Sequence, residues 1–145
     1  MSGIIVGVDG SACSLRALDW ALREGGIQHV PVAVVTVGHQ TAGRWGGPLP
    51  TKADVAEHAR KQAEEEIGLA LDRIGPQSRP ESITVTAVTD PSPADVLQSA
   101  AEDADLLVVG ARGVGGFRLL RLGSVCTRVT YHARCPVVVI PADGT

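Results

Sequence analysis

The stretch IIVGVDGSACSLRALDWAL, residues 4–22, contains the pattern that repeats through the rest of the chain. Its first five residues, 4–8, form a continuous apolar run, which predicts a short buried strand. A turn at residues 9–11 follows, and either Ser11 or Ser14 can cap the helix that comes next. The following leucines recur at the spacing of one helix face: Leu15, Leu18 and Leu22. The stretch therefore predicts a strand, a turn and a helix.

The same alternation continues to the C-terminus. We expect the first helix to end at Gly25-Gly26. Further strands are predicted at residues 30–37, 82–89, 105–109 and 137–140. Helices are predicted to start at Thr51, Ser92 and Ser124. In the long second helix, Glu64, Glu65 and Glu66 favour a solvated face.

This order of elements, βαβαβαβαβ, predicts an α/β fold. Because most strands are continuous apolar runs, we expect a parallel sheet with helices on both faces and right-handed crossovers. Residues 1–145 read as one domain, and residues 38–50 read as a loop by composition. In such sheets, ligands bind outside the carboxyl ends of the strands, where the strand order reverses.

Composition narrows the class of protein. The 145 residues are 44% hydrophobic but only 3% aromatic, so the core must consist of Val, Leu, Ile and Ala. No apolar run approaches the roughly 20 residues of a membrane span. The three cysteines form no CxxC pair and the four histidines are scattered. We therefore expect a cytoplasmic protein with free thiols, without membrane contact and without a metal held by side chains.

Charge is distributed unevenly along the chain. Residues 106–142 contain five arginines and no Asp or Glu, whereas the remainder contains eight basic and sixteen acidic residues. This balance does not favour a nucleic-acid-binding protein. It suits one local anion site, although arginines that only decorate a surface would give the same count.

A second stretch, VVGARGVGGFRLLRLGSVCTRVT at residues 108–130, carries the strongest functional signal. Its spacing is G110-x2-G113-x9-G123-S124. Glycines allow close approach of the backbone to an anion, and a helix N-terminus offers unsatisfied N–H groups. The P-loop pattern fails because Gly116 stands where lysine is required, and the dinucleotide fingerprint fails at Arg118.

This spacing matches the nucleotide-binding signature of the universal stress protein family, in its ATP-binding branch. The chain also resembles that family at its opening, residues 4–22, and at its ending, GSVCTRVTYHARCPVVVI. The resemblance implies a Rossmann-like, adenine nucleotide alpha hydrolase-like fold. Its five-stranded parallel sheet, of order 3-2-1-4-5, would lie between four helices. The first and fourth strands would then be neighbours, and the segments that follow them would face one crevice.

The resemblance also implies roles for individual residues. Asp9 would bind the ribose hydroxyls, although an aspartate in such a turn can instead bond its own backbone. The base and nucleoside would contact Gly7, Val8, Val37, Val109 and Gly110. The phosphates would contact Gly113, Gly123, Ser124 and Val125, and we add Arg112 as a flanking charge. The ligand would be ATP, with Mg²⁺ held by phosphates and water.

These residues favour a binding module over an enzyme. Residues 106–142 contain no Lys, Asp, Glu or Gln, so no evident base lies beside the phosphates, and no catalytic residue is assigned. We expect a nucleotide-binding regulatory protein of the stress response. The alternatives are a slow ATPase and a sensor of AMP or cyclic AMP.

The last strand bears on assembly. An apolar edge strand is normally protected by pairing. The family resemblance implies a homodimer through Val137, Val138, Val139 and Ile140. A monomer shielded by Pro136 and Pro141 is the alternative.

Overall fold

A computed structural model describes residues 3–38, 51–89, 92–111 and 124–141 of the chain. Strands and helices alternate from end to end, with one short 3-10 helix, η1. The strands are β1 (Ile4–Val8), β2 (Val32–Gly38), β3 (Ile83–Thr89), β4 (Leu106–Gly110) and β5 (Val137–Ile140). The helices are α1 (Ala12–Gln28), α2 (Lys52–Ile74), η1 (Pro76–Ser78), α3 (Pro93–Ala100) and α4 (Ser124–His132).

The five strands form one parallel sheet in the order β3-β2-β1-β4-β5. β1 is the central strand: Ile4 pairs with Val32 of β2 on one side and with Leu106 of β4 on the other. The order implied by the family resemblance is therefore confirmed. The strand order reverses at β1 and β4, so the site predicted there lies at the carboxyl edge of these strands.

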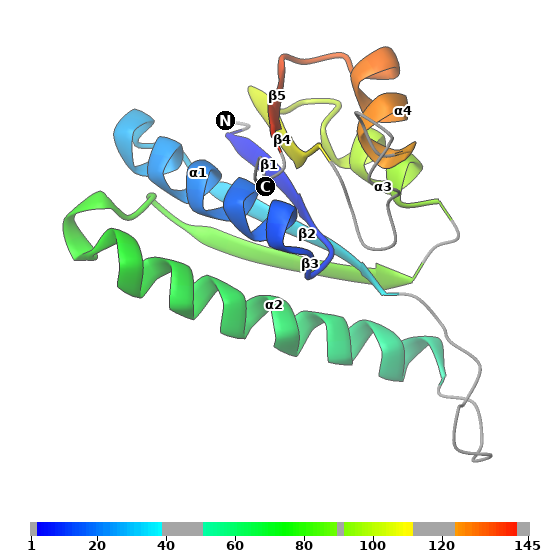
Figure 1. Cartoon of the computed structure of the whole chain (residues 1–145), viewed down its shortest axis with the longest axis horizontal. Coiled ribbons are helices and arrows are strands. Elements are labelled where there is room, and N and C mark those ends of the chain that lie inside the picture. The colour runs from blue at the N-terminus through cyan, green and yellow to red at the C-terminus, as the bar shows by residue number, and fades with distance from the viewer. Residues whose placement is uncertain (1–2, 39–50, 90–91, 112–123, 142–145) are drawn as a thin grey trace.

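Two layers of helices cover the sheet (Figure 1). α1 and α2 pack on one face, around a buried cluster that includes Val6, Leu18 and Ile67. α3 and α4 pack on the other face, around a second cluster that includes Leu97, Leu107 and Val129. Both clusters consist mainly of Val, Leu, Ile and Ala, as the composition predicts. None of the helices in the described part of the chain is long and apolar enough to cross a membrane.

Side-chain caps determine where the helices begin. The Ser11 hydroxyl accepts a hydrogen bond from the Ser14 backbone N–H, so Ser11 is the cap of α1. Thr51 and Asp54 form a reciprocal capping box at the start of α2. Ser92 caps α3, with Pro93 in its first turn. The predicted starts of these helices are confirmed.

The predicted end of α1 at Gly25-Gly26 is wrong. The helix continues to Gln28, and His29 caps it in the left-handed conformation with φ of 56°. The two glycines serve close packing instead of termination. A Cβ on Gly26 would lie 2.0 Å from the carbonyl oxygen of Ser78 in η1, so only glycine allows this approach.

Candidate functional site

A cavity of about 460 Å³ lies at the carboxyl ends of β1 and β2. Its walls come from the turn after β1, from the end of β2 and from one face of α2. Figure 1 shows how α2 runs alongside this part of the sheet. The lining residues are Asp9, Gly10, Thr36, Val37, Gly38, Asp54, Val55, His58, Ala59, Gln62, Ala63 and Glu66.

The spacing of residues on α2 creates this space. Val55, Ala59 and Ala63 recur at four-residue intervals and therefore share a helix face. The alanines occupy little volume opposite Val37 at the end of β2, which leaves a recess with apolar walls. Its volume falls within the roughly 300–1,000 Å³ typical of small-molecule sites.

Asp9 lies in a hydrogen-bonded turn that precedes the start of α1. Its Oδ1 accepts a hydrogen bond of 2.9 Å from the Ser11 N–H, and its own N–H donates to Ser14 Oγ at 3.2 Å. Gly10 adopts a φ of +85°, which L side chains disfavour. The bond between an aspartate and its own backbone is thus present. This bond uses only part of the acceptor capacity of the Asp9 carboxylate, because the two oxygens of a carboxylate can accept about four hydrogen bonds.

Glu66 lies half-buried in the cavity wall, so the predicted solvated face is wrong for this residue, while Glu64 and Glu65 are exposed. Burial raises the pKa of the Glu66 carboxyl, and the charges of Asp9 and Glu65 raise it further. A hydrogen bond from the Gln62 side chain opposes this shift. The sequence signal was the position of Glu66 three residues after Ala63 on the buried stripe.

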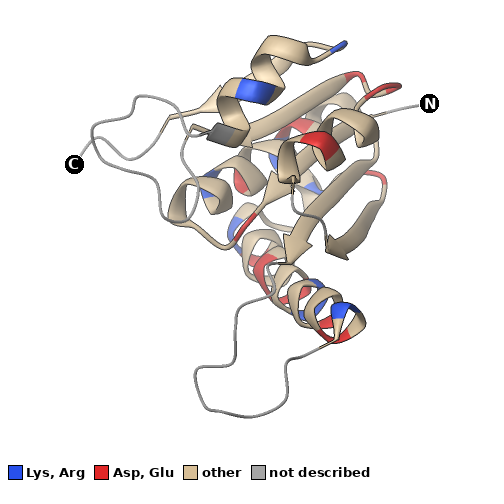
Figure 2. Ribbon diagram, turned by 90° about the vertical axis from the view of Figure 1, so that its right-hand side faces the viewer, with Lys and Arg blue, Asp and Glu red and all other residues tan. Residues whose placement is uncertain are grey.

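The cavity is acidic. Asp9, Asp54 and Glu66 line it, and no lysine or arginine is among the described residues that do so. α2 as a whole carries both signs of charge, as Figure 2 shows, so the acidic character belongs to this face. Carboxylates around a recess repel anions and favour groups that donate hydrogen bonds. The cavity suits an uncharged, donor-bearing part of a ligand better than a phosphate.

The structure separates the predicted site residues into groups. Asp9 and Val37 line the cavity. Val8 and Val109 are 4% exposed and belong to the core. A Cβ on Gly7 would lie 2.9 Å from the Leu97 side chain, so Gly7 packs against α3. Any contact from Gly7, Val8 or Val109 to a ligand must therefore use backbone atoms.

The second predicted segment is described only at its two ends. Gly110 ends β4, where an added Cβ would lie 2.9 Å from Cys13 Sγ, so this glycine permits close packing on α1. Ser124 begins α4, as predicted. Val125, the next residue, packs against the second core cluster. Arg112, Gly113, Gly123 and the segment 39–50 lie outside the described residues.

Two buried thiols lie near the end of β4. Cys13 Sγ donates to the carbonyl oxygen of Ile140 at 3.3 Å. Cys126 is 2% exposed, and burial raises the pKa of its thiol, with a smaller contribution from nearby Cys13. A thiol with a raised pKa is a poor nucleophile at neutral pH. The described residues also contain no group of three or more His, Cys, Asp or Glu that could hold a metal ion.

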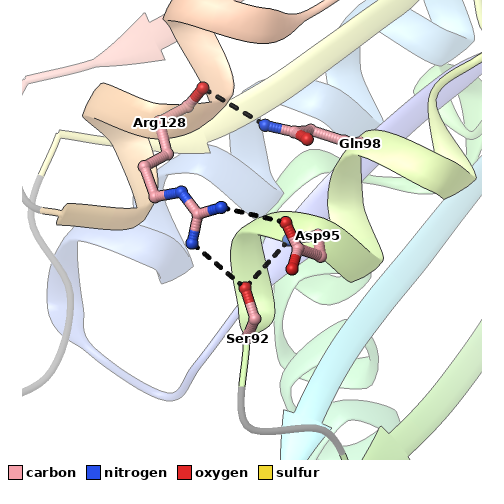
Figure 3. A network of polar contacts seen from close by, with 4 residues as sticks. All are labelled: Ser92, Asp95, Gln98 and Arg128. Atoms are coloured by element: carbon pink, nitrogen blue, oxygen red, sulfur yellow. Dashed lines mark hydrogen bonds and ion pairs between the residues drawn. The ribbon is translucent and has the colours of Figure 1, made fainter.

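A polar network joins Arg128, in the middle of α4, to α3 (Figure 3). The Arg128 guanidinium donates to Asp95 Oδ1 at 3.1 Å and to Ser92 Oγ at 3.3 Å. Gln98 Nε2 donates to the Arg128 carbonyl oxygen at 3.2 Å. The network holds α4, whose N-terminus belongs to the predicted phosphate site, against α3.

Comparison with known proteins agrees with this fold. A model of the universal stress protein family matches residues 1–141. The chain belongs to the universal stress protein family. A universal stress protein of Mycolicibacterium smegmatis is 34% identical over 148 residues, covering 97% of this chain and 48% of that protein. One from Mycobacterium tuberculosis is 33% identical over 144 residues, covering 95% and 47%. This family member thus spans about half the length of these curated relatives.

Solved structures of the family share the architecture. A universal stress protein in complex with cAMP has 26% identity and a TM-score of 0.66, covering 97% of this chain and 96% of that one. The Archaeoglobus fulgidus universal stress protein in complex with dAMP has 27% identity and a TM-score of 0.57, covering 97% and 98%. The Rossmann-like α/β fold of this family member is therefore shown, and two structural relatives are nucleotide complexes.

Proposed function

We propose that this universal stress protein binds ATP and acts as a nucleotide-binding regulatory module of the stress response. The observation that carries the proposal is the cavity at the carboxyl edge of β1 and β2. It brings together Asp9 and Val37, the two residues that the resemblance assigns to ribose and base. The two nucleotide complexes among its structural relatives support the same ligand class.

The charges around the site favour one orientation of the bound nucleotide. The acidic cavity disfavours phosphates, so the base and ribose belong there. The phosphates belong toward the N-terminus of α4 and the arginine-rich segment 106–142. Gly113, Gly123, Ser124 and Val125 keep their proposed role there, with Arg112 beside them. Bound Mg²⁺ would neutralise phosphate charge, held by phosphate oxygens and water.

A cyclic-nucleotide or AMP sensor is the second candidate. It is favoured by the relative of 26% identity that is in complex with cAMP. A sensor of AMP or cAMP would depend little on the phosphate glycines. Competition binding of ATP, AMP and cAMP to the purified protein ranks the three ligands. We expect ATP to bind most tightly.

We propose that hydrolysis is at most slow. Residues 106–142 contain no carboxylate, lysine or glutamine that could position an attacking water at the phosphates. Single-turnover and steady-state assays with ATP test this directly. Sustained turnover above about 1 s⁻¹, an ordinary enzymatic rate, that Gly113→Ala abolishes would make the protein an ATPase.

We also propose a homodimer through β5 and a cytoplasmic location. β5 lies at one edge of the sheet, where its outer backbone groups have no partner strand among the described residues. Edge strands of this kind favour pairing with a second chain. Cys13, Cys126 and Cys135 are free thiols, which suits a reducing compartment.

The first prediction concerns Asp9. Asp9→Asn should weaken ATP binding about tenfold, because hydrogen bonds to a charged acceptor are stronger than those to an amide. The asparagine oxygen can still accept from the Ser11 N–H, so the turn should persist. Isothermal titration calorimetry with ATP measures the change.

Asp72→Asn is the matched control, since Asp72 is exposed on α2 and outside the cavity. It should leave the affinity unchanged. If Asp9→Asn and Asp72→Asn bind ATP as tightly as the unmodified protein, Asp9 does not hold the ribose.

A further inference from the structure

The strand β3 forms one edge of the sheet, and its composition favours pairing with further strands. Its seven residues, ITVTAVT, include no charged residue, no proline and no glycine. Uncharged segments of this length and high β-propensity pair readily with identical copies when they lie on an edge. Natural edge strands are protected by a charge, a proline, a bulge or a covering segment. The residues of β3 supply no charge and no proline, and their register with β2 runs without a break, so protection must come from another segment.

The hydrogen-bond register shows which backbone groups of β3 face away from the sheet. The Ser82 carbonyl oxygen accepts a hydrogen bond of 2.9 Å from the Val32 N–H of β2. Backbone groups of alternate residues point to the same side of a strand, so the even-numbered residues of β3 face β2. The N–H and carbonyl groups of Ile83, Val85 and Ala87 therefore face the outer edge. A further strand would have to bond to these groups.

The Arg60 side chain of α2 reaches this outer row of backbone groups. α2 runs alongside β3 (Figure 1), and its Arg60 Nη1 donates to the Val85 carbonyl oxygen at 3.1 Å. One of the outward acceptors is therefore already bonded. The Arg60 side chain is 40% exposed, so its charge remains in contact with solvent beside the strand. A strand that approached β3 here would have to break this hydrogen bond and displace a charged guanidinium.

We infer that Arg60 closes the β3 edge to pairing with a second copy of this chain. The partner that it excludes is β3 of another molecule, since identical uncharged strands pair readily with one another. The opposite edge differs, because β5 has only four residues. With β3 closed, the proposed pairing through β5 ends at a dimer. With both edges open, pairing would continue from molecule to molecule.

Arg60→Ala should open the β3 edge, because it deletes the hydrogen bond and the charge while retaining a good helix former. Sedimentation velocity at low and high micromolar concentration compares this variant with the unmodified protein. At the higher concentration the apparent mass of the variant should be at least about twice that of the unmodified protein, since pairing through β3 joins whole assemblies. The chain has a net charge of −3, so the loss of an arginine increases repulsion between molecules and opposes non-specific association.

Two further variants show whether the association is specific to β3. Arg23→Ala is the matched control, because Arg23 is exposed on α1 and its loss changes the net charge equally. It should sediment as the unmodified protein does. The double variant Arg60→Ala with Thr86→Lys places a positive charge on the edge strand at an exposed position. It should return to the size of the unmodified protein. Thermal melts of all three variants check that they are folded.

Three results would overturn the role of Arg60. Arg60→Ala that sediments as the unmodified protein at both concentrations would show that Arg60 does not close the edge. Equal association of Arg23→Ala would assign the effect to the loss of charge in general. Larger species that persist after Thr86→Lys is added would show that β3 is not the pairing edge. None of these measurements contains a nucleotide, so their outcome is independent of the proposed ATP binding.

Discussion

The Glu66 carboxylate lies half-buried in the cavity wall, where burial disfavours its charged form. Burial is the largest cause of its raised pKa, followed in the same direction by Asp9 and Glu65. The folded state therefore binds the Glu66 proton more tightly than the unfolded chain does. The free energy of unfolding falls as pH rises from the ordinary pKa of a glutamate to the raised one.

Glu66→Gln should remove this pH dependence. The variant should gain stability relative to the unmodified protein as pH rises from about 4 to 8, starting near the ordinary glutamate pKa. Urea unfolding at several pH values measures the difference. Glu64→Gln, an exposed neighbour on α2, is the control and should follow the unmodified protein. Parallel pH profiles for both variants would contradict the account of Glu66.

At the scale of residues, the sequence predicts part of the candidate site. Asp9 directly follows β1 and Val37 lies at the end of β2, so their place at the carboxyl edge could be expected. Gln62 and Glu66 enter the site only through the packing of α2 beside β1 and β2. Ala63 and Ile67 mark the buried face of α2, but a single sequence does not show which of the polar residues beside that face line a cavity.

Side-chain hydrogen bonds define the N-terminus of α3 in this protein. Ser92 caps α3 by accepting from the Asp95 N–H, and its hydroxyl also accepts from Arg128 on α4. Ser92→Ala should cost about 1 kcal/mol of stability. Loss of the exposed Arg128–Asp95 pair in Arg128→Ala should cost at most about 1 kcal/mol, since the median exposed ion pair contributes less.

Urea unfolding with an unchanged m-value is the measurement for both. Ser99→Ala, an exposed serine within α3, is the control and should stay within about 0.5 kcal/mol of the unmodified protein. A Ser92→Ala variant no less stable than Ser99→Ala would show that the cap contributes nothing.

The predicted end of α1 at Gly25-Gly26 is wrong for a reason that also concerns single elements. Capping residues act on their own helix, so the starts at Ser11, Thr51 and Ser92 can be read locally. α1 continues past Gly26, which packs closely against η1, about 50 residues further along the chain. Gly25 and Gly26 have the composition of a helix stop, but they meet tertiary contacts that a local pattern does not contain.

For the whole molecule, periodicity predicts the class of fold and family resemblance supplies the strand order. Apolar runs such as β1 and β4 show that both faces are covered. They do not show which strands are neighbours, because these strands are nearly alike in composition. The observed order agrees with the family. β3 lies at one edge of the sheet, and two of its residues, Thr84 and Thr86, are exposed.

The proposed dimer is tested at this scale. The carbonyl oxygens of Pro136 and Ile140 bond to β4, so those of Val137 and Val139 face the outer edge in a regular strand. Val139→Pro should convert the dimer to a folded monomer by removing an edge N–H. Sedimentation velocity at micromolar concentration measures the state. If the unmodified protein sediments as a monomer, the proposed dimer is wrong.

The central place of β1 has a consequence for folding during synthesis. One edge of β1 can pair with β2 as soon as residue 38 is available, but the other edge pairs with β4, around residues 106–108. About 70 residues must be translated between these two events, which takes several seconds at typical elongation rates. During that interval the nascent chain exposes the edge of its most central strand. The half-formed sheet therefore has an unpaired strand edge of the kind that favours aggregation during folding.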